Sequence, residues 1–357
     1  MPKARLLAPW HQPGLIAALE AEGLSVEELA TLKGKPAIYH CVSRVVNREF
    51  VLGDQEREQF VAFMRDYERF CGLRVLAFCV MSNHFHILLE VPSAPEERGA
   101  DWSDERLLEH LSGLYSKQQM GALRWELEHY RTQKNTEAAE AFRERYLRRM
   151  WDLSQFMKTL KHRFTRWFNK HHGRKGTLWE ERFKSVLVED GHAARTMAAY
   201  IDLNPVRARM VDDPKDYRWC SYAEAVAGKT RSREGLQRVM YEADAAELAE
   251  EIAVEELISW RKAAYHYRQI LYMAVNRDDP NLDPEDAPQL TETDALLCRM
   301  RELIDGVALG TGPFIENIFG WYRDRFSEGR KSGARKLKGL RSPLRTLRDL
   351  RPDSGNT

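Results

Sequence analysis

Three short apolar runs near the start of the chain predict strands. Residues 37–45, AIYHCVSRV, are rich in β-branched residues and alternate in polarity, while residues 73–81, LRVLAFCVM, and 84–91, HFHILLEV, are strongly apolar. Only Ser82 and Asn83 separate the second run from the third, and two residues suffice for a hairpin turn. We therefore expect the second and third strands to be antiparallel neighbours.

Helical periodicity fills the gap between the first two strands and dominates the segment after the third. Residues 54–71 place apolar side chains at helical spacing, Asp54 can cap the start of this helix, and Gly72 follows its end. Residues 92–150 begin with a polar, proline-containing loop and continue as charged, helix-prone sequence, so we interpret them as an inserted helical hairpin. The order β-α-β-β with a helical insertion predicts an α+β fold.

More elements follow the insertion. Residues 154–172 predict a long basic helix with an aromatic face, which the sequence GRKG ends. Residues 182–189, RFKSVLVE, predict a strand, and residues 191–204 predict a helix that Pro205 stops. We expect one domain to hold all of these elements, over residues 35–235.

The two ends of the chain lie outside this domain. Residues 1–34 form an N-terminal extension with no assigned role, and residues 236–357 predict a separate helical region that ends in a basic tail. Two helix candidates before the tail, 293–305 and 313–327, could form a DNA-binding helix-turn-helix or a helical hairpin packed on the main domain. The tail itself, 330–351, could bind DNA nonspecifically through counterion release.

Composition becomes informative once charge is followed along the chain. The 357 residues carry a formal net charge of +1, and the five cysteines form no CxxC pair, so we expect neither a disulfide framework nor a cysteine zinc site. The N-terminus lacks an apolar signal core and no stretch reaches the length of a membrane span, so we expect a cytoplasmic protein with no membrane partner. Basic residues concentrate between 158 and 184, where only Glu180 and Glu181 oppose them, which predicts contact with nucleic-acid phosphates.

DNA contacts are expected from this basic segment and its surroundings. Its helix interleaves cations with Phe164, Trp167 and Phe168, whose rings we expect in the core rather than stacked on bases. Trp179 is a stacking candidate because it lies in a predicted loop between basic residues, and Arg44 is either a phosphate contact or an ordinary surface arginine. The full set of DNA-binding candidates is Arg44, Lys158, Lys161, Arg163, Arg166, Arg174, Lys175, Trp179, Arg182 and Lys184.

Two histidines stand one residue apart on the third predicted strand. His84 and His86 project from the same face, roughly 7 Å apart at Cα by strand rise, while Phe85 points into the core. Two imidazoles on one face can chelate a divalent cation, but a further protein ligand must come from another element. The alternative is that both are hydrogen-bonded structural histidines.

The helix before Pro205 supplies candidates for such a site. Tyr200 and Asn204 are four residues apart and share one helical face. The amide oxygen of Asn204 suits Mg²⁺ or Mn²⁺, and a tyrosine beside a metal that grips a phosphate is a candidate nucleophile. The alternative is that Tyr200 belongs to the core and Asn204 caps the helix.

Four segments together resemble the single-tyrosine HUH transposases, and most closely their REP-associated, IS200-like branch. The segments occur in the family's order and, with the DYRWCSY that follows them, cover roughly residues 37–222. They are AIYHCVSR at 37–44, VMSNHFHILLEVP at 80–92, GTLWEERFKSVLVE at 176–189 and YIDLNPVRARMV at 200–211.

The resemblance implies a fold and a chemistry. It implies a ferredoxin-like antiparallel sheet flanked by helices, to which this chain adds a helical insertion and a helical C-terminal region. It implies that His84, His86 and Asn204 hold Mg²⁺ or Mn²⁺, and that Tyr200 cleaves single-stranded, hairpin-forming, REP-like palindromic DNA through a 5′ phosphotyrosine. Some relatives build each active site from two chains, so monomer and homodimer both stay open.

Two other functions stay open beside this DNA strand transferase. The first is a domesticated DNA-binding protein that recognises palindromic repeats without cutting them, which the joint presence of Tyr200, His84, His86 and Asn204 disfavours. The second is a replication-initiation or relaxase nickase of the same HUH class. Many of those carry a second tyrosine or a third histidine, which we do not identify in place in this sequence.

Overall fold

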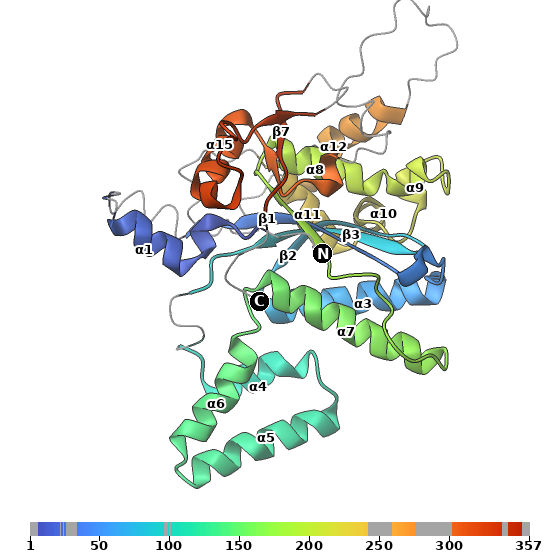
Figure 1. The fold of residues 1–357 in the computed structure, drawn as a ribbon. Coiled ribbons are helices and arrows are strands. Elements are labelled where there is room, and N and C mark those ends of the chain that lie inside the picture. Colours follow the sequence, from blue (N-terminus) through green and yellow to red (C-terminus); the bar gives the residue numbers. More distant parts are fainter. Residues whose placement is uncertain are drawn as a thin grey trace, which may run out of the picture. The chain divides into compact units, whose positions relative to one another are not determined.

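The chain is divided into two compact units. The first contains residues 1–57, 75–90 and 178–357, and the second contains residues 58–74 and 91–177. Figure 1 shows the ribbon. The computed structural model describes residues 6–21, 23, 25, 34–95, 99, 101–241, 259–275, 302–337 and 342–351.

One sheet organises the first unit. Among the described residues it has seven strands in the order β2-β3-β1-β4-β5-β7-β6. β2 and β3 are neighbours joined by residues 81–83, and the Met81 N–H donates to the His84 carbonyl at 2.8 Å, which confirms the predicted hairpin. The strands are β1 (Ala37–Arg44), β2 (Arg74–Val80), β3 (His84–Val91), β4 (Lys184–Val188), β5 (Ala308–Gly310), β6 (Arg335–Lys336) and β7 (Arg345–Leu347).

The central strands are buried on both faces, which explains their continuous apolar sequences. β1 and β4 pair antiparallel with Ile38 opposite Val188. β4 then pairs parallel with β5, where Leu187 lies opposite Ala308. A parallel pair needs a long crossover connection, and here the chain between residues 188 and 308 provides it.

Helices pack on the sheet within the first unit. α8 contacts β4 and β5, and α11 runs so close to β2 that a Cβ on Gly235 would lie 2.5 Å from the Val75 carbonyl oxygen. The helical elements of this unit are η1 (Pro9–His11), α1 (Pro13–Ala21), η2 (Val46–Arg48), α8 (His192–Asp202), α9 (Asn204–Arg207), η3 (Pro214–Asp216), α10 (Ser221–Val226), α11 (Thr230–Met240), α12 (Trp260–Val275), α14 (Glu302–Asp305), α15 (Gly312–Trp321) and η7 (Arg323–Arg325).

The second unit is helical. Phe60 packs edge-to-face on Phe164 at 5.2 Å between ring centroids, and Gly72 ends its helix with φ +63°, the left-handed conformation expected of a C-terminal cap. Its helices are most of α3 (Asp54–Cys71), α4 (Asp104–Ser112), α5 (Lys117–Thr132), α6 (Thr136–Leu147) and α7 (Leu153–His171).

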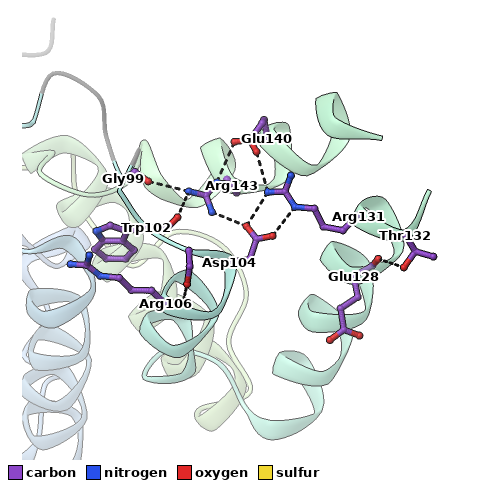
Figure 2. A network of polar contacts seen from close by, with 10 residues as sticks. Gly99, Trp102, Asp104, Arg106, Glu128, Arg131, Thr132, Glu140 and Arg143 are labelled. Carbon is purple, nitrogen blue, oxygen red and sulfur yellow. Dashed lines mark hydrogen bonds and ion pairs between the residues drawn. The ribbon is translucent and has the colours of Figure 1, made fainter. Parts of the chain in front are cut away.

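A carboxylate at the start of α4 ties the helices of the insertion together (Figure 2). Asp104 accepts hydrogen bonds from Arg131 at 2.7 Å and from Arg143 at 2.7 Å. The bond from Arg131 does most to hold the pKa of Asp104 below its usual value, and the bond from Arg143 lowers it further. Arg143 also donates to the carbonyls of Gly99 and Trp102, so one guanidinium fixes the loop that leads into α4.

The predicted α+β class is confirmed, with a mostly antiparallel sheet flanked by helices in which β4 and β5 are the parallel pair described above. The insertion is helical, but its described residues form three helices, α4 to α6, rather than a two-helix hairpin. The C-terminal region differs more from the prediction of a helical region. β5 lies between the two helix candidates, and the basic tail supplies β6 and β7. These segments are strands because apolar residues such as Leu309 and Leu347 are buried in the sheet. The first of the two helix candidates lies largely outside the described residues, and the second is α15.

Candidate functional site

A cavity of about 630 Å³ in the first unit brings the predicted site residues together. His84, His86, Tyr200 and Asn204 all line it. They come from β3, from α8 and from the first residue of α9. More than 110 positions separate the histidine pair from Tyr200 and Asn204 in the sequence, so only the tertiary structure brings the four side chains together.

Strand alternation orients the two histidines as predicted. The rings of His84 and His86 are 5.1 Å apart between centroids, while Phe85 is fully buried and packs edge-to-face on Trp179. His84 Nδ1 lies 2.7 Å from the Asn83 side-chain oxygen. His86 Nδ1 lies 2.9 Å from His40 Nε2, and the planes of the His40 and His86 rings are nearly parallel, with an interplanar angle of 11°.

The helix that carries Tyr200 ends sooner than predicted. α8 stops at Asp202, and Asn204 begins the short helix α9. Pro205 has no N–H to offer the Ile201 carbonyl, and Asn204 Nδ2 takes that place at 3.0 Å. The same Nδ2 donates to the Tyr200 carbonyl at 3.3 Å. Asn204 keeps its place beside Tyr200 through these bonds.

Arg207 places its guanidinium over the Tyr200 ring. Its guanidinium carbon lies 3.9 Å from the centre of the Tyr200 ring, and its Nη2 donates to the Tyr200 carbonyl at 2.6 Å. The Tyr200 ring also meets His86 edge-to-face at 6.3 Å between centroids. Tyr200 is only 1% exposed, so the ring forms a wall of the cavity rather than projecting into solvent.

Burial favours the neutral form of His40 and His86. Burial lowers the pKa of His40 to about 4. Burial also lowers the pKa of His86 well below its usual value, and the neighbouring His40 and His84 lower it further. Neutral imidazoles have one lone pair each for a metal or a hydrogen bond.

The donor set at the cavity fits a divalent cation. Two imidazoles are present, and because Asn204 Nδ2 is committed to carbonyls, Oδ1 is the atom of its amide that can bind a metal. Among the described residues, no group of three histidine, cysteine, aspartate or glutamate side chains is placed to hold a metal. A site here therefore depends on the amide oxygen as its third protein ligand.

The predicted DNA contacts divide between the two units. Arg44, Arg182 and Lys184 line the cavity, as does Arg48. Lys158, Lys161, Arg163, Arg166, Arg174 and Lys175 belong to the second unit, where Arg163 pairs with Asp66 at 3.4 Å and lies over the Phe63 ring. Phe164 and Phe168 are buried, as predicted.

Trp179 does not offer the stacking surface expected of it. It is 6% exposed, its ring packs on Phe85, and its backbone bridges to Val45. The segment that the sequence suggests is a loop runs along the end of β1, which turns the indole into the core. Trp179 is therefore a packing residue in this structure.

Two residues beside the site escaped the sequence analysis. His40 lies on β1 within an apolar run, a signal that could have singled it out, since a histidine there must be hydrogen-bonded to be buried. It is a third histidine next to the pair, which the sequence analysis did not identify. Arg207 gave no such signal, because its spacing from Tyr200 is that of any helix neighbour.

The strands that carry the histidines match a known protein family. The match runs over residues 35–96, and the family model is described as Transposase IS200 like. Residues 35–96 are similar to IS200-like transposases. This segment contains His40, His84 and His86, whereas Tyr200 and Asn204 lie outside it. The match supports a DNA-processing transposase function.

Other comparisons add one solved structure. The chain is similar to a REP-associated tyrosine transposase bound to a REP hairpin, with 15% identity and a TM-score of 0.35, over 63% of this chain and 94% of that one. No curated protein matches the chain. None of the described helices has the length and apolarity that a membrane span requires.

Proposed function

We propose that the protein is a metal-dependent endonuclease and strand transferase for single-stranded, hairpin-forming DNA, with Tyr200 as its nucleophile. The observation that carries the proposal is that His84, His86, Tyr200 and Asn204 line one cavity. Mg²⁺ or Mn²⁺ held by His84 Nε2, His86 Nε2 and Asn204 Oδ1 would neutralise charge that develops on the scissile phosphate.

The chain's own residues account for the remaining chemistry. The Tyr200 oxygen forms a bond to phosphorus as the bond from phosphorus to the 3′ oxygen breaks, which leaves a 5′ phosphotyrosine and a 3′ hydroxyl. Arg207 stabilises the negative charge on the phenol oxygen as its proton leaves. The phosphotyrosine keeps the energy of the broken bond, so a 3′ hydroxyl can reverse the step without a nucleotide cofactor.

Positive charge around the cavity fits a nucleic-acid strand. Cations outnumber acids in its lining, where Arg44, Arg48, Arg182, Lys184 and Arg207 stand against Glu180, Glu181 and Asp305. Phosphate contacts of this kind position a strand without reading its sequence. REP-like palindromes are the proposed substrates because the four segments at 37–44, 80–92, 176–189 and 200–211 resemble the REP-associated branch, and residues 35–96 match an IS200-like transposase family.

One observation favours a second candidate function. Tyr200 is 1% exposed, as a core tyrosine would be, and this suits a domesticated protein that binds palindromic DNA without cutting it. The two candidates share the fold and the basic cavity, and they differ in whether Tyr200 becomes bonded to DNA.

A covalent-adduct assay separates them. Labelled hairpin DNA with a single-stranded flank is incubated with the protein and Mn²⁺, and an SDS-resistant adduct is sought. We expect an adduct that Tyr200→Phe and EDTA abolish, while Tyr200→Phe still binds the DNA. Tyr222→Phe is the matched control, because Tyr222 is buried to 2% exposure but does not line the cavity, and it should keep the adduct.

Two outcomes would contradict the proposal. An adduct that survives Tyr200→Phe assigns the nucleophile elsewhere. Tight hairpin binding by the wild type with no adduct at any Mn²⁺ concentration supports the non-cleaving alternative.

A further inference from the structure

Each histidine of the pair is held at Nδ1 by a hydrogen-bond chain that ends on a backbone carbonyl. From His86 the chain passes to His40 Nε2, and His40 Nδ1 reaches the Leu303 carbonyl at 3.4 Å. From His84 it passes to the Asn83 oxygen, and Asn83 Nδ2 donates to the Arg48 carbonyl at 2.9 Å. The two series of hydrogen bonds come from different elements, but each runs from a histidine Nδ1 through one side chain to a backbone carbonyl.

A carbonyl oxygen can only accept, and this decides where the protons lie. The Leu303 carbonyl requires a proton on His40 Nδ1, so His40 Nε2 is the acceptor of a neutral ring. His86 Nδ1 must then be the donor to His40 Nε2. The lone pair of His86 consequently falls on Nε2. Asn83 Nδ2 donates to the Arg48 carbonyl, so the Asn83 oxygen is the atom that accepts from His84 Nδ1–H. The lone pair of His84 therefore also falls on Nε2.

We propose that His40 is a positioning residue, whose Nε2 selects the Nδ1–H tautomer of His86 and so presents His86 Nε2 as a metal ligand. The opposite tautomer would put the proton on His86 Nε2 and block coordination there. Metal-ligating histidines are ordinarily oriented by a partner at the second ring nitrogen. The proposal rests on the proposed function for the metal, whereas the tautomer can be measured without one.

The C-terminal region takes part in this selection. Leu303 belongs to α14, is 1% exposed, and precedes the cavity-lining residues Ile304 and Asp305. Lys184 of β4 pairs with Asp305 at 3.5 Å, which holds α14 beside the sheet. A segment outside the IS200-like match therefore supplies the carbonyl that selects the His40 tautomer.

The first test is the tautomer in the metal-free protein. Long-range ¹H–¹⁵N correlation spectra of histidine-labelled protein distinguish Nδ1–H from Nε2–H, and His40→Gln and His86→Gln assign the signals. We expect His40 and His86 both to carry their proton on Nδ1. A proton on His86 Nε2 in the wild type overturns the proposal, whatever the protein does to DNA.

The second test is Mn²⁺ affinity by calorimetry, without DNA. His40→Phe keeps a planar ring but has no acceptor, and we expect it to weaken Mn²⁺ binding by about 10–100-fold. His40→Gln, whose side-chain oxygen can accept from His86 Nδ1–H, should recover most of that loss. The matched control is His11→Phe. His11 also contacts a backbone carbonyl, that of Lys35, but neither residue lines the cavity, whereas His40 contacts the cavity-lining His86.

The outcomes separate this proposal from the proposed function. Wild-type Mn²⁺ affinity in a folded His40→Phe variant overturns the positioning role. If His40→Phe does not fold, His40→Gln and the wild-type spectra decide the matter. If no Tyr200 adduct forms but Mn²⁺ affinity depends on His40, the positioning role stands and strand cleavage does not.

Discussion

At the scale of single residues, the structural and functional interpretations of the site are compatible. His84 and His86 are hydrogen-bonded, as structural histidines would be, but both bonds are made at Nδ1. Asn204 caps a helix end, as the simpler interpretation expects, but only its Nδ2 does so. Each side chain has two polar atoms, so one can serve the fold while the other faces the cavity.

Arg207 gives the prediction that belongs to this scale. Arg207→Met keeps the length of the side chain but removes the charge over the Tyr200 ring and the bond to the Tyr200 carbonyl. We expect adduct formation to slow by about tenfold or more, because the variant lacks the positive charge that stabilises the phenolate. The measurement is the single-turnover rate of adduct formation at saturating DNA.

Arg209→Met is the control for this change. Arg209 is exposed, lies two residues further along, and does not line the cavity. Equal rates in the two variants would mean that Arg207 acts only through general charge.

At the scale of elements, close approach of backbones decides which helices can cover the sheet. α11 lies against β2 at Gly235, where an added Cβ would lie 2.5 Å from the Val75 oxygen and 2.8 Å from the Leu76 oxygen. Both atoms belong to a strand backbone that cannot move without disturbing its pairing. The glycine is therefore required by packing, although its sequence context is that of an ordinary helix.

The corresponding prediction compares two helical glycines. Gly235→Ala should destabilise the protein by about 2 kcal/mol or more, since overpacking against backbone cannot be relieved by a rotamer change. Gly121→Ala in α5, where nothing lies within 4 Å of the new Cβ, should be stabilising by about 0.5–1 kcal/mol through helix propensity. Urea denaturation measures both, and similar effects at the two sites would contradict the close approach of α11 to β2.

At the scale of the first unit as a whole, the C-terminal region completes the sheet. β5 joins β4 through bonds from the Leu187 N–H to the Val307 carbonyl and from the Glu189 N–H to the Leu309 carbonyl, both 2.9 Å. Glu189 also accepts from the Thr311 N–H, which ties β4 to the start of α15. The C-terminal strands and the site therefore share one sheet, since β4 pairs with β1 on its other edge.

This arrangement predicts that damage to β5 is felt in β4. Leu309 is fully buried, and Leu309→Ala should lower the free energy of unfolding by about 3 kcal/mol. We expect faster hydrogen exchange at the Leu187 and Glu189 amides, because the carbonyls that protect them belong to the loosened strand. Leu127→Ala, a buried leucine in α5 of the other unit, should raise exchange in α5 instead. Unchanged protection of β4 in Leu309→Ala would mean that the C-terminal region folds separately.

The sequence by itself determined the local elements and the candidate chemistry. The bounds of α3 and β3 and the alternation that puts His84 and His86 on one face follow from periodicities of 3.6 and two residues, which are local properties of the backbone. Asn204 lies beside Tyr200 although the helix ends between them, because its Nδ2 donates to the Tyr200 and Ile201 carbonyls. The tertiary structure alone decided that β5 and β7 complete the sheet, that His40 meets His86 at a ring nitrogen, and that Trp179 is buried. Those outcomes depend on contacts between residues far apart in the chain, and no local pattern records which distant partner a buried side chain will meet.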